Sequence, residues 1–198
     1  MAVPSAQLRR DARIEKRRRR IVDAALSNFA TRGYTPTSVD DVVSKARVSK
    51  SAFYEFFESK EHCFREVLAA EGGSLIHDVL TEAATGRDHH ERLRLGITRF
   101  VHECFDRPEV ARLLIVESVG LSKGVEVVRY ELQARFADAV GEEVRHAMSH
   151  DAFYADKDPA VFGRAVVGAV SDAVGYFLTH PGVDADSLAE SLCRIFAP

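Results

Sequence analysis

The chain has 198 residues, of which 46% are hydrophobic, so it is long and apolar enough to bury a core and is not a disordered chain. No apolar run approaches the length needed to cross a bilayer, and no apolar segment follows the N-terminal charges, so we expect neither a membrane span nor a secretory signal. The three cysteines are scattered, which excludes a disulfide framework and a zinc ribbon and indicates a reduced, cytoplasmic compartment. The net charge of -3 combines a basic N-terminal third (residues 1–65) with an acidic remainder, so only the former suits a polyanionic partner.

Residues 1–15 show no periodicity and are expected to form a flexible tail. A run of five cations, Lys16 to Arg20, comes next and leads into apolar residues at helical spacing, which predict a helix that ends near Gly33. Cations at a helix start oppose the helix dipole, and an external phosphate would relieve that cost. The alternative to phosphate binding is that these cations are simply solvated.

Two short helices are expected next. Ser38 is placed to cap the first, with Asp41 where the acid of a capping box belongs, and Val42, Val43 and Ala46 bury one face. Arg47 and Val48 form the turn, and Ser49 caps a second helix that runs to about Phe57. Phe53 and Phe57 point into the core, whereas the other side chains lie near or on the outer face: Lys50, Ser51, Ala52, Tyr54, Glu55 and Phe56. This layout is that of a helix-turn-helix.

Residues 17–65 resemble the TetR family of transcriptional repressors. The resemblance is carried by Gly33-Tyr34, Thr37-Ser38-Val39 and above all the segment from Val48 to Glu61. Three positions depart from the family pattern: Arg47 and Ser51 stand where Gly is common, and Phe56 where His or Tyr is common. The resemblance implies an all-α protein of about nine helices, with a three-helix DNA-binding head at residues 16–62 and a larger ligand-binding and dimerisation domain at 63–198.

The implied recognition helix, about Ser49–Phe57, would enter the major groove. Thr37 and Ser38 at a helix N-terminus, the Tyr54 hydroxyl and the Lys60 ammonium suit phosphates. Lys50 suits a guanine or a phosphate, Ala52 a thymine methyl, and Glu55 either accepts from cytosine or points away from DNA. The full expected DNA-binding set is Arg17, Arg18, Thr37, Ser38, Ser49, Lys50, Ser51, Ala52, Tyr54, Glu55, Phe56 and Lys60.

The sequence after residue 65 is expected to form further helices. Gly72-Gly73 indicates a hinge or close packing. Small residues in the helix from Asp158 to about His180 would let a second subunit approach closely, or would bury this helix within one subunit. The expected dimerisation set is Gly163, Ala165, Gly168, Ala169, Ala173, Leu188 and Leu192.

An effector pocket is expected among these helices, with mostly apolar walls. The expected lining residues are Phe100, Cys104, Leu113, Glu117, Tyr130, Phe136, Val166 and Tyr176. Glu117 is the polar exception and would either recognise the effector or pair with an arginine such as Arg112 or Arg129.

No nucleotide-binding, hydrolase or metalloprotease motif is present, so we expect no catalytic residue, cofactor or metal. His146 and His150 share a helix face, but their place near a helix C-terminus favours a role opposite the helix dipole. The resemblance implies a homodimeric regulator, by default a repressor, released from a palindromic operator by a small, largely apolar effector. The alternatives are a small helical enzyme or carrier with a basic N-terminus, and a non-specific architectural DNA binder.

Overall fold

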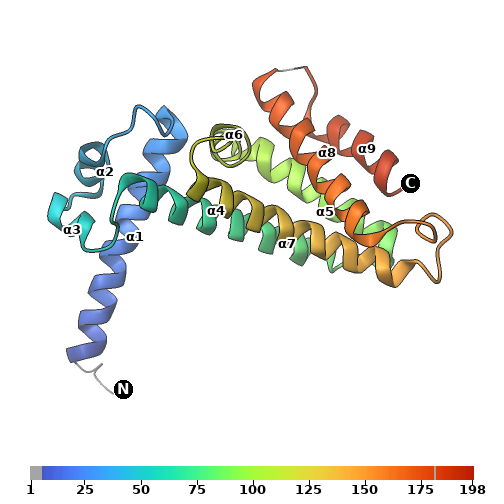
Figure 1. Cartoon of the computed structure of the whole chain (residues 1–198), viewed down its shortest axis with the longest axis horizontal. Helices are drawn as coiled ribbons and strands as arrows, with labels where there is room; N and C mark the ends of the chain where they lie inside the picture. Colours follow the sequence, from blue (N-terminus) through green and yellow to red (C-terminus); the bar gives the residue numbers. More distant parts are fainter. Residues whose placement is uncertain (1–5, 181) are drawn as a thin grey trace. The chain divides into compact units, whose positions relative to one another are not determined.

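The computed structural model describes residues 6–180 and 182–198, and this part of the chain contains helices and no strand (Figure 1). The all-α prediction is therefore confirmed. The chain divides into two compact units, the first ending at Val67 and the second running from Leu68 to Pro198. Each unit has its own buried core.

The first unit contains α1 (Ala6–Arg32), α2 (Val39–Ala46), α3 (Lys50–Tyr54) and the start of α4 (Lys60–Ala83). The expected capping box is present, with the Ser38 side chain accepting from the Asp41 amide and the Asp41 carboxylate accepting from the Ser38 amide. Gly33, at φ 84°, follows the last residue of α1, as expected for a helix stop.

The start of α1 differs from the prediction. Residues 6–15 were expected in a flexible tail, but the helix already begins at Ala6. This segment is built mainly from Ala, Gln, Leu, Arg and Glu, which are strong helix formers, and Glu15 lies 3.9 Å from Arg18 one turn later. This segment is therefore helical because of the propensities of its residues, although it lacks the periodic apolar residues from which a helix is predicted. The expected tail residues 1–5 lie outside the described residues.

The core of the first unit is aromatic and extends into α4. Phe29 meets Phe64 edge to face at 5.2 Å between ring centroids, and Tyr34 lies 4.6 Å from Phe64. Phe64 and Val67 are fully buried. These contacts explain why the first unit continues to Val67, beyond the expected domain limit at residue 62.

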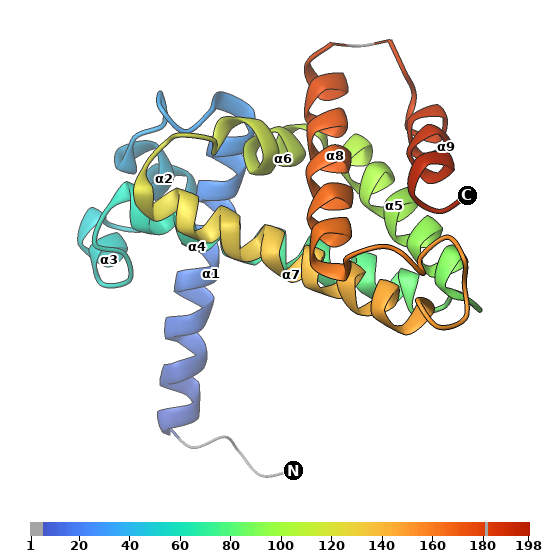
Figure 2. The same cartoon turned by 45° about the vertical axis from the view of Figure 1, so that its right-hand side comes forward.

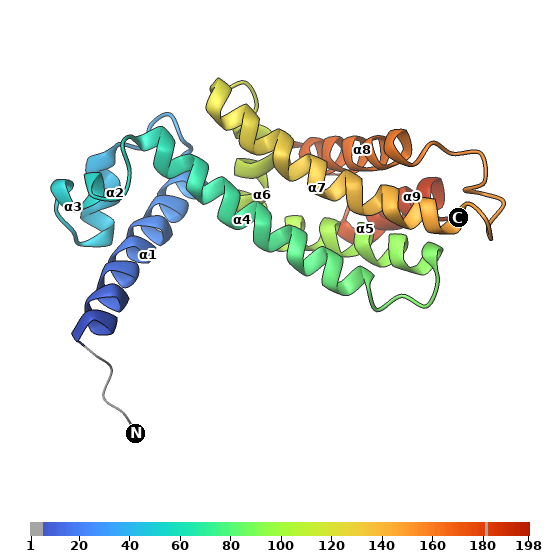
Figure 3. The ribbon, with the colours of Figure 1, turned by 60° about the horizontal axis from the view of Figure 1, so that its bottom comes forward.

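The second unit contains the rest of α4, then α5 (His89–Asp106), α6 (Pro108–Arg112), the π-helical turn η1 (Leu113–Glu117), α7 (Lys123–Ala147), α8 (Pro159–Thr179) and α9 (Ala185–Phe196). Helices α7 and α8 run side by side (Figure 3), and α9 packs on α5 (Figure 2). The helix α4 continues through Gly72-Gly73. A Cβ on Gly72 would lie 2.5 Å from a methyl carbon of Leu132, so Gly72 allows close packing.

Three residues expected in a dimer interface instead serve the core of one chain. A side chain on Gly163 would overlap the carbonyl oxygen of Ala137, so this glycine lets α8 approach α7. Leu188 and Leu192 are buried in the core cluster that α9 forms with α5. Helical periodicity identifies an apolar face but does not say whether the same chain or a second copy covers it.

The helix α8 also corrects the expectation that no apolar run is long enough to cross a membrane. One window within Pro159–Thr179 has a mean hydropathy of 1.4 and meets that test by length and composition. A single helix of this kind is weak evidence for a membrane span, because core helices of soluble proteins also pass.

Candidate DNA-binding surface and effector cavity

The turn between α2 and α3 is held in a left-handed conformation. Arg47 has φ 53° and ψ 51°, a region in which a residue with a Cβ is strained by about 1–2 kcal/mol. The Arg20 guanidinium of α1 donates to the carbonyl oxygens of Ala46 and Arg47, the latter at 3.2 Å. These hydrogen bonds hold the turn despite the absence of the glycine that is common at this position.

The segment after the turn stands on the surface as predicted. The Ser49 side chain accepts from the Ala52 amide at 3.1 Å, and Phe53 and Phe57 are buried beneath. Tyr54 is 50% exposed. The helix is shorter than expected, ending at Tyr54, and Ala52 is buried at 7% exposure. The prediction that Ala52 meets a thymine methyl is therefore wrong: its methyl group belongs to the underside of α3.

Two exposed ion pairs tie this segment to its neighbours. Lys50 lies 3.0 Å from Asp40 of α2, and the pKa of the Lys50 ammonium is raised chiefly by its hydrogen bond to that carboxylate. Glu55 lies 3.1 Å from Arg17 of α1. Exposed pairs contribute about 0–1 kcal/mol, so both cations can exchange their carboxylate for a phosphate. Glu55 is thus turned toward α1, and its possible base contact stays a prediction.

The prediction that the Thr37 hydroxyl binds a phosphate is wrong, because this side chain is 1% exposed and donates to the carbonyl oxygen of Gly33 at 2.8 Å. Arg18 pairs with Glu66 and lies over the Phe57 ring, 5.9 Å from its centroid. Both side chains hold the first unit together.

The Lys60 ammonium also points inward. It donates to the carbonyl oxygens of Tyr34 at 3.0 Å, Thr35 at 3.4 Å and Thr37 at 2.9 Å, and lies 4.1 Å from the centre of the Tyr34 ring. Desolvation by burial lowers the pKa of Lys60. An ammonium has three donors. All three find an acceptor in the loop between α1 and α2, so Lys60 holds this loop in the DNA-free chain, and its phosphate contact stays a prediction.

The other expected contacts remain predictions. The Ser38 hydroxyl is exposed but engaged in the capping box with Asp41. The Ser49 and Ser51 hydroxyls lie 2.9 Å apart at the start of α3, and Phe56 is half-buried beside Phe57.

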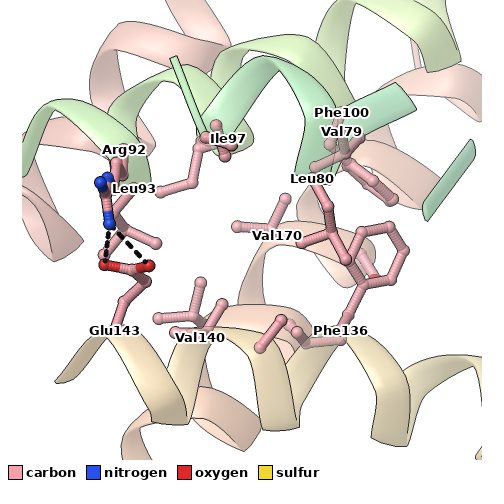
Figure 4. Close-up of a pocket in the computed structure, with 17 residues that line it drawn as sticks. Val79, Leu80, Arg92, Leu93, Ile97, Phe100, Phe136, Val140, Glu143 and Val170 are labelled. Carbon is pink, nitrogen blue, oxygen red and sulfur yellow. Dashed lines mark hydrogen bonds and ion pairs between the residues drawn. The ribbon is translucent and has the colours of Figure 1, made fainter. Parts of the chain in front are cut away.

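The second unit holds two neighbouring cavities, which share four lining residues. The inner chamber has a volume of about 230 Å³ and lies between α4, α5, α7 and α8 (Figure 4). The outer chamber, of about 610 Å³, adjoins η1 and the other halves of α4, α7 and α8. The four residues that line both are Phe100, Phe136, Val167 and Ser171. We call these four residues the neck.

The neck is narrowed by an aromatic pair. Phe100 and Phe136 meet edge to face, with centroids 5.6 Å apart and planes at 86°. The Ser171 hydroxyl is the polar side-chain group of the neck, and no hydrogen bond to it is formed within the described residues. A ligand that passes the neck would therefore meet one hydrogen-bonding group between apolar walls.

The two chambers differ in their polar groups. In the inner one Arg92 pairs with Glu143 at 3.3 Å (Figure 4), and Glu143 also lies 2.8 Å from His89. This pair closes one end of an otherwise largely apolar space. The outer chamber carries Arg129, Gln133 and Asp172 on its wall. The inner chamber suits a hydrocarbon segment and the outer chamber suits a polar one.

Half of the expected lining residues are found in these chambers. Phe100 and Phe136 line both, Val166 lines the inner one and Tyr176 the outer one. The other expected lining residues lie elsewhere: Cys104 and Leu113 are buried outside both chambers, Glu117 pairs with Arg112 at 3.2 Å, and Tyr130 is 63% exposed. Burial raises the pKa of the Cys104 thiol to about 12, which keeps it uncharged.

Sequence reasoning missed Arg92, Glu143 and Ser171. A signal existed only for the last, because Ser171-Asp172 interrupts the apolar sequence of α8. Arg92 and Glu143 are 51 positions apart in the sequence and lie on different helices, so their pairing is visible only in the folded chain.

A capped α2, a tight turn and an exposed α3 over an aromatic core define a helix-turn-helix DNA-binding domain. Residues 21–67 match the family model described as bacterial regulatory proteins, tetR family. Residues 21–67 therefore form a DNA-binding domain of the type found in the TetR family of transcriptional regulators.

Relatives and solved structures agree with this assignment. The transcriptional activator FasR of Mycolicibacterium smegmatis is 31% identical over 99 residues, an alignment that covers 49% of this chain and spans less than half, 45%, of that protein. The uncharacterised regulator YdgC of Bacillus subtilis is 24% identical, with 90% of this chain and 89% of that protein aligned. The structure of the regulator FadR from Bacillus subtilis in complex with stearoyl-CoA superposes with a TM-score of 0.81 at 16% identity, covering 90% of this chain and 96% of that chain.

Proposed function

We propose that this regulator acts as a homodimer on a two-fold operator and that an elongated, largely apolar effector in the two chambers changes its affinity for DNA. The observation that carries this proposal is the pair of adjacent, mainly apolar cavities in the second unit, which share four lining residues. An effector shifts DNA affinity only as far as it binds the free and DNA-bound forms differently. We propose repression relieved by the effector as the direction of the response.

An exposed face of α8 supports dimerisation. Around the charged Asp172 it carries small or apolar residues at helical spacing, of which Gly168 and Tyr176 also line the outer chamber: Val161, Ala165, Gly168, Ala169 and Tyr176. A Cβ built on Gly168 meets no atom within 4 Å, so a second helix has room to approach there. The exposed Ile195 of α9 adds apolar surface. A dimer presents two copies of α3, as a two-fold operator requires.

A Gly168→Arg variant tests this interface. Because the position is open, the arginine should leave the fold of one chain intact while its charge and bulk keep two chains apart. We expect a monomer in sedimentation and the loss of cooperative binding to paired half-sites. Gly182→Arg is the control, because Gly182 is exposed, also has no atom within 4 Å and lies outside α8. A Gly168→Arg protein that remains dimeric would remove α8 from the interface.

The chambers favour an effector with a hydrocarbon segment and a polar end. The hydrocarbon would pass the neck into the inner chamber, and the polar end would stay beside Arg129, Gln133 and Asp172. The Ser171 hydroxyl is placed to donate to a carbonyl oxygen in the neck. The stearoyl-CoA of the FadR complex is a ligand of this type in a protein of the same fold, which supports the choice of acyl thioesters as probes.

Acyl-CoA probes of increasing chain length, octanoyl to stearoyl, provide the test. Ligand at about 100 times its Kd stabilises the protein by roughly 2.7 kcal/mol, which a thermal shift detects. An Ala139→Leu substitution fills part of the inner chamber and should move the best chain length to a shorter one. Tyr130→Leu is the control, because Tyr130 lies outside the chambers. Stabilisation independent of chain length, or none with any probe, would refute the threaded binding mode.

A further inference from the structure

The N-terminal part of α1 extends beyond the other helices of the first unit (Figures 1, 2 and 3). Residues 8–17 are exposed without interruption. At 1.5 Å per residue, the stretch from Ala6 to Lys16 is about 15 Å long. Isolated helices of this length are marginal in water, so a partner surface would stabilise this extension.

Four cations of α1 share one face of the helix. Arg9, Arg13, Lys16 and Arg20 recur at intervals of four, three and four residues and therefore form one row along the helix. We call this row the basic stripe. Asp11 and Glu15 fall near the opposite side at about 100° per residue. Arg10 lies between these two faces.

The stripe is free at its outer end. Among the described residues, no carboxylate pairs with Arg9, Arg13 or Lys16. Arg9, in the first turn of α1, also opposes the helix dipole, at a cost of about 0.3–1 kcal/mol. An anionic partner would both pair these cations and remove that cost.

At its inner end the stripe joins the helix-turn-helix. Arg20 donates to the carbonyl oxygens of the turn at residues 46 and 47, and Lys16 and Arg20 line one shallow groove with Lys45 and Arg47. The groove holds one acid, Asp23. Positive charge is therefore continuous from the tip of α1 to the turn that precedes α3.

We propose that the basic stripe is a second DNA-binding element, which lies along backbone phosphates that flank the site read by α3. Its ligand is the phosphate backbone of a duplex, and its contribution is independent of base sequence. The stripe extends the contact beyond the helix-turn-helix itself and would hold the chain on DNA while α3 reads bases.

The salt dependence of DNA affinity tests this role. Each phosphate contact contributes about 0.9 to the slope of log affinity against log salt concentration. In the full chain, Arg9→Gln/Arg13→Gln should lower that slope by roughly 1.8 and leave the preferred sequence unchanged. Arg9→Lys/Arg13→Lys keeps both charges and should retain the wild-type slope.

Arg87→Gln/Arg145→Gln is the charge-matched control, because both arginines are exposed in the second unit. A slope equal to that of this control would overturn the proposal. A duplex trimmed to the site read by α3 should abolish the difference between wild type and the stripe variant, and a difference that persists there would also contradict it. An unchanged DNA slope combined with loss of binding to phosphatidylserine vesicles would also contradict the proposal, because it would assign the stripe to a membrane.

Circular dichroism checks that the glutamines preserve the helix. The slope can be measured on any duplex, so this test stands even if the chain selects no preferred operator from a random library. Absence of a preferred operator would count against the proposed function. A stripe variant that keeps sequence preference but binds with an unchanged slope would count against the stripe alone.

Discussion

The Lys60→Ala variant distinguishes two roles of this side chain, holding the loop between α1 and α2 or contacting a DNA phosphate. The two roles predict opposite results. The ammonium donates to three loop carbonyls, and those of Tyr34 and Thr37 are the part-buried acceptors. A hydrogen bond to a charged group contributes about 1.5–3 kcal/mol, and water will replace part of it at a half-buried site. We therefore expect the variant to lose about 2 kcal/mol of stability in the first unit.

Native-state hydrogen exchange at the buried Val42 and Val43 amides of α2 measures this loss locally, because α2 follows the loop that Lys60 holds. The salt slope of DNA binding should stay near the wild-type value, since no phosphate contact is removed. Lys123→Ala is the control, removing an exposed charge from the second unit. Unchanged exchange with a slope lower by about 0.9 would show that Lys60 contacts a phosphate and would refute its role in holding the loop.

Four further substitutions probe the backbone and pH. Gly163→Ala should lower the free energy of unfolding by about 1–3 kcal/mol, because its methyl group would overlap the Ala137 carbonyl, whereas Gly168→Ala should be neutral or favourable in urea denaturation of the monomer. Arg47→Gly should gain up to about 1 kcal/mol in the same assay, since relief of left-handed strain outweighs the added chain entropy, and a loss would show that Arg47 is not strained. The pKa of Asp41 is about 2, below its ordinary 3.8, chiefly because the Ser38 hydroxyl bonds its carboxylate. Its stabilising effect should be complete above about pH 4 and lost as pH falls toward 2, so acid unfolding of Asp41→Asn should lack this component.

The chambers were the least accessible part of the protein to sequence reasoning. Phe100 and Phe136 were expected to line a pocket, but the apolar spacing of their helices could not show that they meet at a neck. Cys104 lies on the same helix as Phe100 and was expected beside it, yet its thiol is turned into the core. A helical repeat fixes which residues share a face, whereas the neighbours of that face depend on how the helices cross.

Local sequence signals determined the helix-turn-helix, because capping and burial act within a few residues: Ser38 with Asp41, Ser49 with α3, and Phe53 with Phe57. Tertiary structure alone decided which surroundings individual side chains meet. The Lys60 ammonium turned to a loop 23 to 26 positions away, and Ala52 turned under α3. It also decided that Leu188 and Leu192 serve the core of one chain and that the cations of α1 align with the turn. Such outcomes depend on contacts between distant segments, which the order of residues does not display.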